Sequence, residues 1–171
     1  MKKILLLIIP LIFLTGCIRI PRIGNSNVVV TSYGAYQIEN LVKREDHSTS
    51  SKVFYVLEKD KYASRPDNIS VEMGTNYYSK NDYMTFVRAI QTQLYQQVGR
   101  NAKIYGSALS NKSGDVVYKF IITKDNDSTV ATQYYVVGDY KYVLVYETNF
   151  SGNKDIDDAA YTIAYTFEWK N

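Results

Sequence analysis

The sequence predicts an α+β domain in which an antiparallel sheet of about six strands is covered by two helices, as an α/β/α sandwich. Three observations support this prediction. Short runs of β-branched and aromatic residues, separated by turn residues, recur along the chain. Two other segments repeat apolar residues at steps of three and four, which is the period of a helix. The chain has 171 residues, a length typical of a single domain.

The first 17 residues have the layout of a secretory signal peptide. Lys2 and Lys3 precede an apolar run over residues 4–13. This run is too short to span a bilayer, which needs about 20 residues. The motif Leu14-Thr15-Gly16-Cys17 that follows resembles the lipobox of bacterial lipoproteins. The resemblance implies that residues 1–16 are removed as a signal peptide. It also implies that Cys17 carries the acyl chains (diacylglycerol and palmitate) that anchor the protein to the extracytoplasmic face of a bacterial cell membrane.

Lipidation of Cys17 would account for the only thiol in the chain. No disulfide, zinc site or cysteine nucleophile is then expected, and no cofactor is predicted. Removing residues 1–16 leaves 155 residues and lowers the basic count from 20 to 18, against 17 acidic residues. A nearly neutral chain lacks the concentrated basic face that nucleic-acid binding requires. We therefore expect no nucleic-acid partner.

Residues 17–51 are expected to form a lipidated tether and an N-terminal polar segment, with one strand over 28–38 and a loop over 39–51. A single domain is expected over residues 52–171. It begins with two short strands, 52–57 and 69–73.

A helix is predicted over residues 79–98. Its inward face is formed by apolar residues at helical spacing, namely Tyr83, Phe86, Val87, Ile90, Leu94 and Val98. Ser79 is a suitable N-cap with Asp82 three residues later, and Gly99 provides the C-terminal stop.

Four strands are predicted next, over 103–109, 116–123, 129–137 and 140–148. Gly138-Asp139 is a strong signal for a two-residue hairpin turn. Such a turn would place Tyr135 opposite Tyr142 and Tyr134 opposite Val143. Apolar residues on both faces predict that this hairpin is central and covered on both sides.

A second helix is predicted from Asp155 to Trp169, with Asp155 as its cap. The expected inward residues are Ile156, Ala160, Ile163 and Phe167. Tyr161, Tyr165 and Trp169 form a separate stripe at four-residue spacing.

This order of elements from Lys52 to Trp169 resembles the Mog1/PsbP-like domain found among small bacterial lipoproteins. The resemblance implies a non-enzymatic accessory or binding domain and brings no set of catalytic residues. A cystatin-like or other arrangement of sheet and helix is the structural alternative.

Candidate catalytic and metal-binding residues are few. His47 is the only histidine and lies in a polar stretch, where a solvated loop residue is expected rather than a general base. Asp125-Asn126-Asp127 has oxygens suited to calcium but lacks the glycine and distant glutamate of an EF-hand, so a plain turn is favoured. Asp155, Asp157 and Asp158 are explained more simply by helix capping than by cation binding.

The chain has 17 tyrosines and one tryptophan. Most tyrosines are expected to fill sheet positions. The alternative is that some form exposed clusters that bind a protein or a sugar. The candidate partner-binding residues are Tyr77, Tyr78, Tyr161, Tyr165 and Trp169.

We therefore expect a membrane-anchored, non-enzymatic binding or accessory module of the cell envelope, with an envelope protein as its partner. One alternative is a surface lipoprotein encoded by a mobile element, with an interference or host-protection role. A remote alternative is an envelope hydrolase, which a deep pocket lined by paired carboxylates would support.

Overall fold

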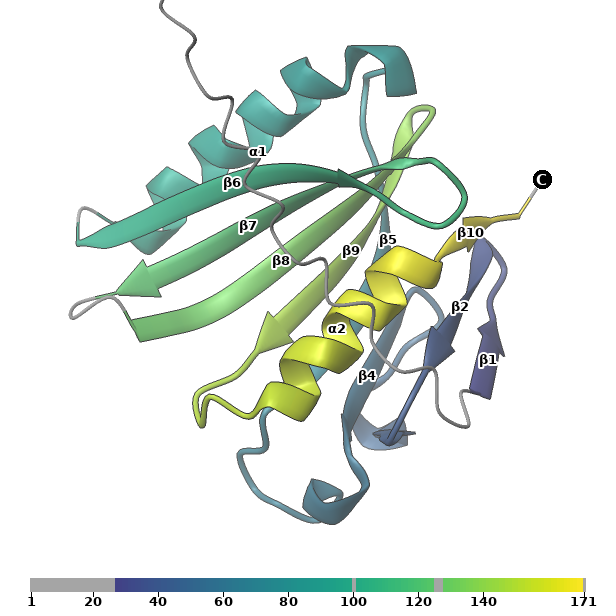
Figure 1. Cartoon of the computed structure of the whole chain (residues 1–171), viewed down its shortest axis with the longest axis vertical. Coiled ribbons are helices and arrows are strands. Elements are labelled where there is room, and N and C mark those ends of the chain that lie inside the picture. Colours follow the sequence, from purple (N-terminus) through teal and green to yellow (C-terminus); the bar gives the residue numbers. More distant parts are fainter. Residues whose placement is uncertain (1–26, 100, 125–127, 171) are drawn as a thin grey trace, which may run out of the picture.

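A computed structural model describes residues 27–99, 101–124 and 128–170 of the chain. These residues form an α+β fold with two α-helices, one large antiparallel sheet and one small antiparallel sheet (Figure 1). The expected signal peptide, Cys17, the start of the tether and the motif Asp125-Asn126-Asp127 lie outside the described residues.

The large sheet has seven strands among the described residues, in the order β3-β4-β5-β9-β8-β7-β6. Their bounds are Leu41–Lys43 (β3), Lys52–Leu57 (β4), Asn68–Thr75 (β5), Ala102–Ser110 (β6), Val116–Lys124 (β7), Ser128–Gly138 (β8) and Lys141–Thr148 (β9). The prediction of about six strands is therefore close. The expected loop over 39–51 contains β3, which pairs with β4 at the edge of the sheet.

The two central strands β8 and β9 are covered on both faces, as predicted. On one face Tyr134, Val136 and the β9 valines pack against the C-terminal helix. On the other face Tyr135 and Val137 pack in a second cluster with the first helix. Buried apolar residues therefore alternate between two cores along each strand.

The predicted register of the β8–β9 hairpin is wrong by one step at the turn. Gly138 pairs with Lys141, so Asp139 and Tyr140 form the turn, and Tyr135 lies opposite Leu144 rather than Tyr142. Tyr134 likewise lies opposite Val145 rather than Val143. Tyr140 takes the positive φ of 56°. Its backbone is held by hydrogen bonds to the segment before the first helix, which outweigh the local preference of glycine for the turn.

Helix α1 covers one face of the large sheet and spans Tyr83–Val98, after a single 3₁₀ turn, η3 (Lys80–Asp82). Phe86, Val87, Ile90 and Leu94 are buried, as the periodicity predicts. The predicted capping is wrong, because Ser79 precedes the 3₁₀ turn and its side chain makes no capping hydrogen bond. Gly99 ends the helix with a φ of 79°, which favours glycine.

Helix α2 lies on the opposite face of the sheet and spans Lys154–Thr166. Its cap is Asn153, whose side chain accepts a hydrogen bond from the backbone N–H of Asp155 at 3.0 Å, so the prediction of Asp155 as the cap is wrong. The prediction of a helix to Trp169 is also wrong. Phe167 is fully buried in extended conformation, and the next two residues form strand β10 (Glu168–Trp169).

A small sheet lies beside α2, in the order β1-β2-β10 (Figure 1). The strand expected over 28–38 is instead a hairpin of β1 (Asn27–Val30) and β2 (Gly34–Ile38). The remaining elements are the 3₁₀ turns η1 (Glu45–His47) and η2 (Glu58–Asp60).

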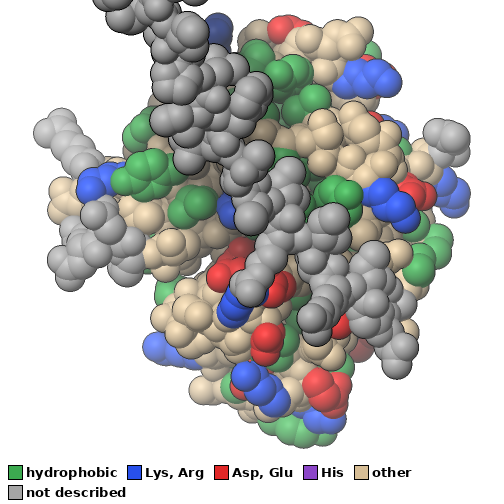
Figure 2. All heavy atoms as spheres, viewed as in Figure 1, with side chains coloured by type: hydrophobic (Ala, Val, Ile, Leu, Met, Phe, Trp, Pro, Cys, Tyr) green, Lys and Arg blue, Asp and Glu red, His purple; other side chains and the backbone are tan. Residues whose placement is uncertain are grey.

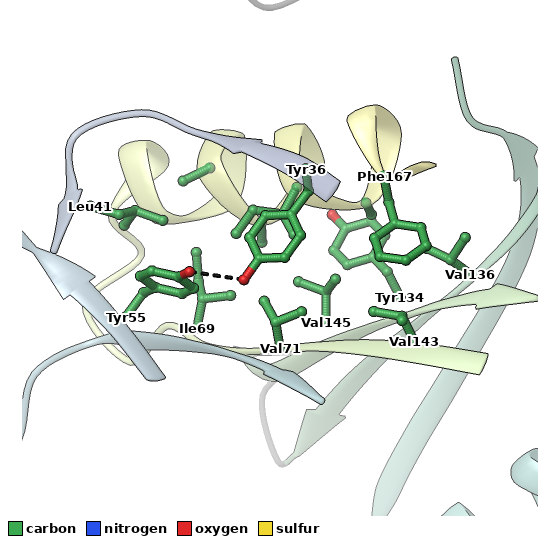
Figure 3. Packing of buried hydrophobic residues seen from close by; sticks show 14 of the residues in the cluster. Tyr36, Leu41, Tyr55, Ile69, Val71, Tyr134, Val136, Val143, Val145 and Phe167 are labelled. Carbon is green, nitrogen blue, oxygen red and sulfur yellow. Dashed lines mark hydrogen bonds between the residues drawn. The ribbon is translucent and has the colours of Figure 1, made fainter. Parts of the chain in front are cut away.

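The small sheet is joined to the large one through a buried tyrosine pair (Figure 3). Tyr36 on β2 and Tyr55 on β4 share a hydrogen bond of 2.8 Å between their hydroxyl groups. Leu41 and Phe167 complete the same core. The folded unit therefore includes residues before Lys52, in the segment expected to be a tether and a polar loop.

Candidate functional site

A pocket of about 520 Å³ opens at one end of the large sheet, beside the start of α2. Its walls come from β7, β8, β9 and the loop that joins β9 to α2. It is lined by Lys119, Ile121, Thr129, Thr132, Tyr134, Glu147, Asn149, Phe150, Ser151, Gly152 and Asp157. Its volume lies within the range of about 300–1,000 Å³ that is typical of small-molecule sites.

Strand register places the polar residues on one face. Glu147 on β9 lies opposite Thr132 on β8. Tyr134, two residues along β8, lies opposite Lys119 on β7. Residues two apart on a strand share a face, so these four side chains all lie on the face that α2 covers. These four residues lie at the boundary between the apolar core under α2 and the pocket.

Glu147 is the central residue of the floor. Its side chain is only 1% exposed, and its Oε1 atom has no hydrogen-bond partner among the described residues. Burial raises the pKa of Glu147 to about 8, and the hydrogen bond with Asp157 and the negative charge of Asp157 add to the effect. Glu147 therefore keeps its proton at neutral pH.

Asn149 fixes the start of α2 against the end of β9. Its side-chain amide donates hydrogen bonds to the Asn153 carbonyl at 2.9 Å and to Oδ1 of Asp157 at 2.7 Å. Its Oδ1 accepts a hydrogen bond from the backbone N–H of Asn153 at 2.8 Å. With its amide and carbonyl groups all engaged, Asn149 holds Asp157 in place beside Glu147.

Asp67, in the loop before β5, fixes the outer rim. Its Oδ1 accepts a hydrogen bond from the backbone N–H of Phe150 at 2.8 Å, and its Oδ2 accepts one from the Ser151 hydroxyl. The Phe150 side chain is 74% exposed although its backbone is held in this way. The pocket thus has an aromatic ring on a fixed part of its rim.

Lys119 provides the positive charge of the lining. Its Nζ lies 5.2 Å from the centre of the Tyr134 ring, which is a cation–π contact. Burial, and the nearby charges of Glu147 and Asp157, raise the pKa of the Tyr134 hydroxyl well above its usual range. The hydroxyl therefore stays protonated and available for hydrogen bonding. Figure 2 shows acidic and basic side chains mixed on the face that carries α2.

Asp155, Asp157 and Asp158 lie near the start of α2, and the last two make local contacts. Asp158 forms an ion pair with Lys154 at 2.5 Å, and Asp157 contacts Asn149 as described. Within the part of the chain that the structure describes, no group of three or more His, Cys, Asp or Glu side chains is arranged to hold a metal ion.

The tyrosine stripe expected on α2 is formed only in part. The rings of Tyr161 and Tyr165 stack, with centres 5.6 Å apart and planes at 10°. Trp169 does not continue this stripe, because it lies on β10, where its ring packs edge-on against Phe167 at 4.9 Å. The structure therefore keeps the tyrosine pair and separates the tryptophan from it.

Trp169 instead lies beside the tip of the β8–β9 hairpin, where it packs over Gly138 and carries the Lys141 ammonium 4.6 Å above its ring. The segment with Tyr77 and Tyr78 reaches the same tip, since the Tyr140 backbone N–H donates to the Tyr78 carbonyl at 2.9 Å.

The two tyrosines of this segment differ in exposure. Tyr77 is 94% exposed, whereas Tyr78 is half-buried and packs against Phe86. His47 is exposed on η1 and lies 3.4 Å from Asp46, as expected for a surface residue.

The pocket residues were not predicted as a site, although the sequence carries a signal for them. Glu147 has the same strand phase as Val143 and Val145, so it is a charged residue in the apolar phase of a central strand. Lys119 stands in the same way between Val117 and Ile121 on β7. Charged residues in inward positions are uncommon, and they mark polar sites inside a fold.

No protein-family model matches the chain, and no curated protein matches its sequence significantly. Among the described residues, no helix has the length and apolar character needed to cross a membrane.

Proposed function

We propose that this chain is a membrane-anchored, extracytoplasmic lipoprotein that serves the bacterial cell envelope as a non-enzymatic binding or accessory module. Its ligand site is the pocket floored by Glu147. The observation that carries this proposal is the buried Glu147 carboxyl. Glu147 lines the pocket, and its Oε1 has no hydrogen-bond partner among the described residues. A buried acceptor of this kind is costly unless a donor completes it.

The arrangement around the pocket favours binding, because its walls are fixed in advance. Asn149 ties the start of α2 to β9, and Asp67 ties the loop that carries Phe150. A pre-formed site loses less conformational entropy when a ligand binds. The site is thus suited to hold a small molecule.

A hydrolase is the second candidate, because the pocket does contain two adjacent carboxyl groups. Both groups are already engaged inside the fold, which argues against a catalytic role. Glu147 is buried beside Asp157, which raises the pKa of the Glu147 carboxyl, and Oδ1 of Asp157 accepts a hydrogen bond from the Asn149 amide.

We further propose that the domain from Lys52 to Trp169 is Mog1/PsbP-like. The order β4, β5, α1, four strands and α2, with the helices on opposite faces of one sheet, supports this assignment. An accessory role would also involve a protein partner in the envelope. Tyr77 and Trp169, on either side of the β8–β9 hairpin tip, are the residues we propose for that contact.

The lipid anchor is tested with the full chain produced in bacterial cells. Wild-type protein is expected in the membrane fraction, shortened by the signal peptide and labelled by radioactive palmitate. Cys17→Ala should incorporate no label and should be either released or left unprocessed. Glu147→Gln, as a control, should keep the label. A Cys17→Ala protein with unchanged size, label and membrane association would overturn the anchor.

The ligand site is tested by a mixed panel of small amines, carboxylates, sugars and short peptides. Binding to the full chain in detergent micelles is followed by saturation-transfer nuclear magnetic resonance. We expect at least one compound class to bind wild-type protein and to lose binding in Glu147→Leu. If no class distinguishes the two proteins, the pocket is not a ligand site.

A further inference from the structure

The lining of the Glu147 pocket favours one class of ligand, and this inference rests on the proposed function. Among the described residues that line the pocket, the charged groups are one ammonium, on Lys119, and one carboxylate, on Asp157. Glu147 adds no charge while it keeps its proton. An anionic ligand would be repelled by the Asp157 carboxylate, and a cationic ligand would be repelled by the Lys119 ammonium. A neutral ligand therefore fits this lining best.

The polar groups of the pocket require a ligand that both donates and accepts hydrogen bonds. Glu147 Oε1 needs a donor, because it is buried without a partner among the described residues. The Lys119 ammonium has only donors. Hydroxyl groups of Thr132 and Tyr134 lie on the same face and serve either way. A ligand hydroxyl meets both needs at once, since it donates one hydrogen bond and accepts others.

A divalent metal ion fits this lining poorly. Calcium takes about 6–8 oxygen ligands. Oδ1 of Asp157 already accepts from the Asn149 amide, and Oδ1 of Asn149 already accepts from the backbone of Asn153. Among the described residues, these two oxygens are therefore already engaged within the fold.

The rim adds an apolar surface above these polar groups. Phe150 presents a mostly exposed ring at the pocket mouth, and Asp67 holds its backbone. A sugar ring has an apolar face of C–H groups that can pack on an aromatic ring, while its edge carries hydroxyls. The aromatic rim of the pocket can therefore contact the face of a sugar ring, while the polar residues of the floor contact its hydroxyl groups.

We propose that the pocket binds a neutral saccharide. Glu147 Oε1 accepts a hydrogen bond from one sugar hydroxyl, Lys119 donates one to another, and the Phe150 ring packs on the face of the sugar ring.

The test uses the full chain in micelles of a zwitterionic detergent, since detergents with sugar head groups would compete. Saturation-transfer nuclear magnetic resonance measures binding of two neutral trisaccharides, chitotriose and maltotriose. Two charged trisaccharides serve as matched probes, the glucosamine trimer and trigalacturonate. Each is measured on wild-type protein and on Phe150→Ala, Glu147→Leu, Glu147→Gln and Tyr62→Ala.

A neutral trisaccharide is expected to bind wild-type protein more tightly than either charged one. Phe150→Ala should weaken binding of the neutral trisaccharide by about fivefold. Glu147→Leu should weaken the same binding by about tenfold. Glu147→Gln keeps a carbonyl acceptor, so it should lose less affinity for the neutral trisaccharide than Glu147→Leu. Tyr62→Ala removes another exposed aromatic ring, away from the pocket lining, and should leave sugar binding unchanged.

Two outcomes overturn the inference. If a charged trisaccharide or a compound of the mixed panel binds in a manner sensitive to Glu147→Leu while the neutral sugars do not, the ligand class is wrong and the binding function stands. If no probe distinguishes wild type from Glu147→Leu, both proposals fail.

Discussion

Glu147, buried near the end of β9, lies beside Asp157 at the start of α2, and burial together with Asp157 raises the pKa of the Glu147 carboxyl. The pair joins a buried strand position to an exposed helix turn. At neutral pH Glu147 keeps its proton. Glu147 also lines the pocket, and its Oε1 has no hydrogen-bond partner among the described residues. Stability and ligand binding should therefore both respond to changes at Glu147.

The first prediction concerns the pH dependence of stability. The pKa of Glu147 is about 8 in the folded protein, against an ordinary value of 4.5. Folding therefore takes up a proton between these values, and the free energy of unfolding should fall as pH rises through this window, by roughly 5 kcal/mol. The stabilising contribution is complete below pH 4.5 and lost above pH 8. Glu147→Gln should remove this slope in chemical denaturation measured from pH 5 to 9.

The matched control for this slope is Glu45→Gln, because the Glu45 side chain is 79% exposed. It should leave the pH dependence unchanged. An identical slope in wild type and Glu147→Gln would show that Glu147 does not hold the proton.

The second prediction concerns the tyrosine pair that joins the two sheets. Tyr36→Phe or Tyr55→Phe leaves the other hydroxyl buried without its partner, which should lower the free energy of unfolding by about 1–3 kcal/mol. The double variant removes both hydroxyls. Its loss in the free energy of unfolding should be smaller than the sum of the losses in the two single variants. Tyr77→Phe should be neutral. Additive losses in denaturation of the four proteins would mean that the hydrogen bond contributes nothing.

The third prediction concerns the junction of β2 and β10. A Cβ atom at Gly34 would lie 2.5 Å from the Glu168 backbone oxygen and 2.5 Å from Cζ of Phe167. Gly34→Ala should therefore lower the free energy of unfolding by about 1–3 kcal/mol. Gly106→Ala is the comparison, since its nearest atom belongs to the Tyr118 side chain, at 2.9 Å. Equal effects of the two substitutions on the denaturation midpoint would contradict the tight β2–β10 contact.

The fourth prediction concerns the rim of the pocket. Asp67→Ala removes the acceptor for the Phe150 and Ser151 backbone N–H groups. Hydrogen exchange at these two amides should become faster, while exchange in β8 and β9 stays the same. Ligand affinity should fall as well, because Phe150 is no longer held. Unchanged exchange at Phe150 would show that Asp67 does not fix the rim.

The sequence predicted regular elements well wherever local pattern decides them. Strand β4 matches its predicted bounds, and the apolar repeat of α1 places its buried residues correctly. The errors arise where distant contacts decide. Trp169 leaves the helix because β10 pairs with β2, which lies more than 100 residues away. Gly138 stays in β8 under the Trp169 ring, so the turn moves to Asp139 and Tyr140.

The candidate site shows the same division. The phase of Glu147 on β9 can be seen in the sequence, but its partner Asp157 and the rim at Phe150 depend on how α2 returns to the sheet. Neither Asn149 nor Asp67 belongs to any pattern of spacing. Their roles appear only once the loop between β9 and α2 is placed against the loop before β5.

The most direct test of a non-enzymatic binding site is mass spectrometry of small molecules that co-purify with the full chain from its own membranes. Wild-type protein and Glu147→Leu are extracted in parallel in the zwitterionic detergent. A bound compound should be enriched with wild-type protein, absent from Glu147→Leu, and recovered chemically unchanged after incubation with fresh wild-type protein. The same compounds in both preparations, or conversion of the compound during incubation, would contradict the proposed function.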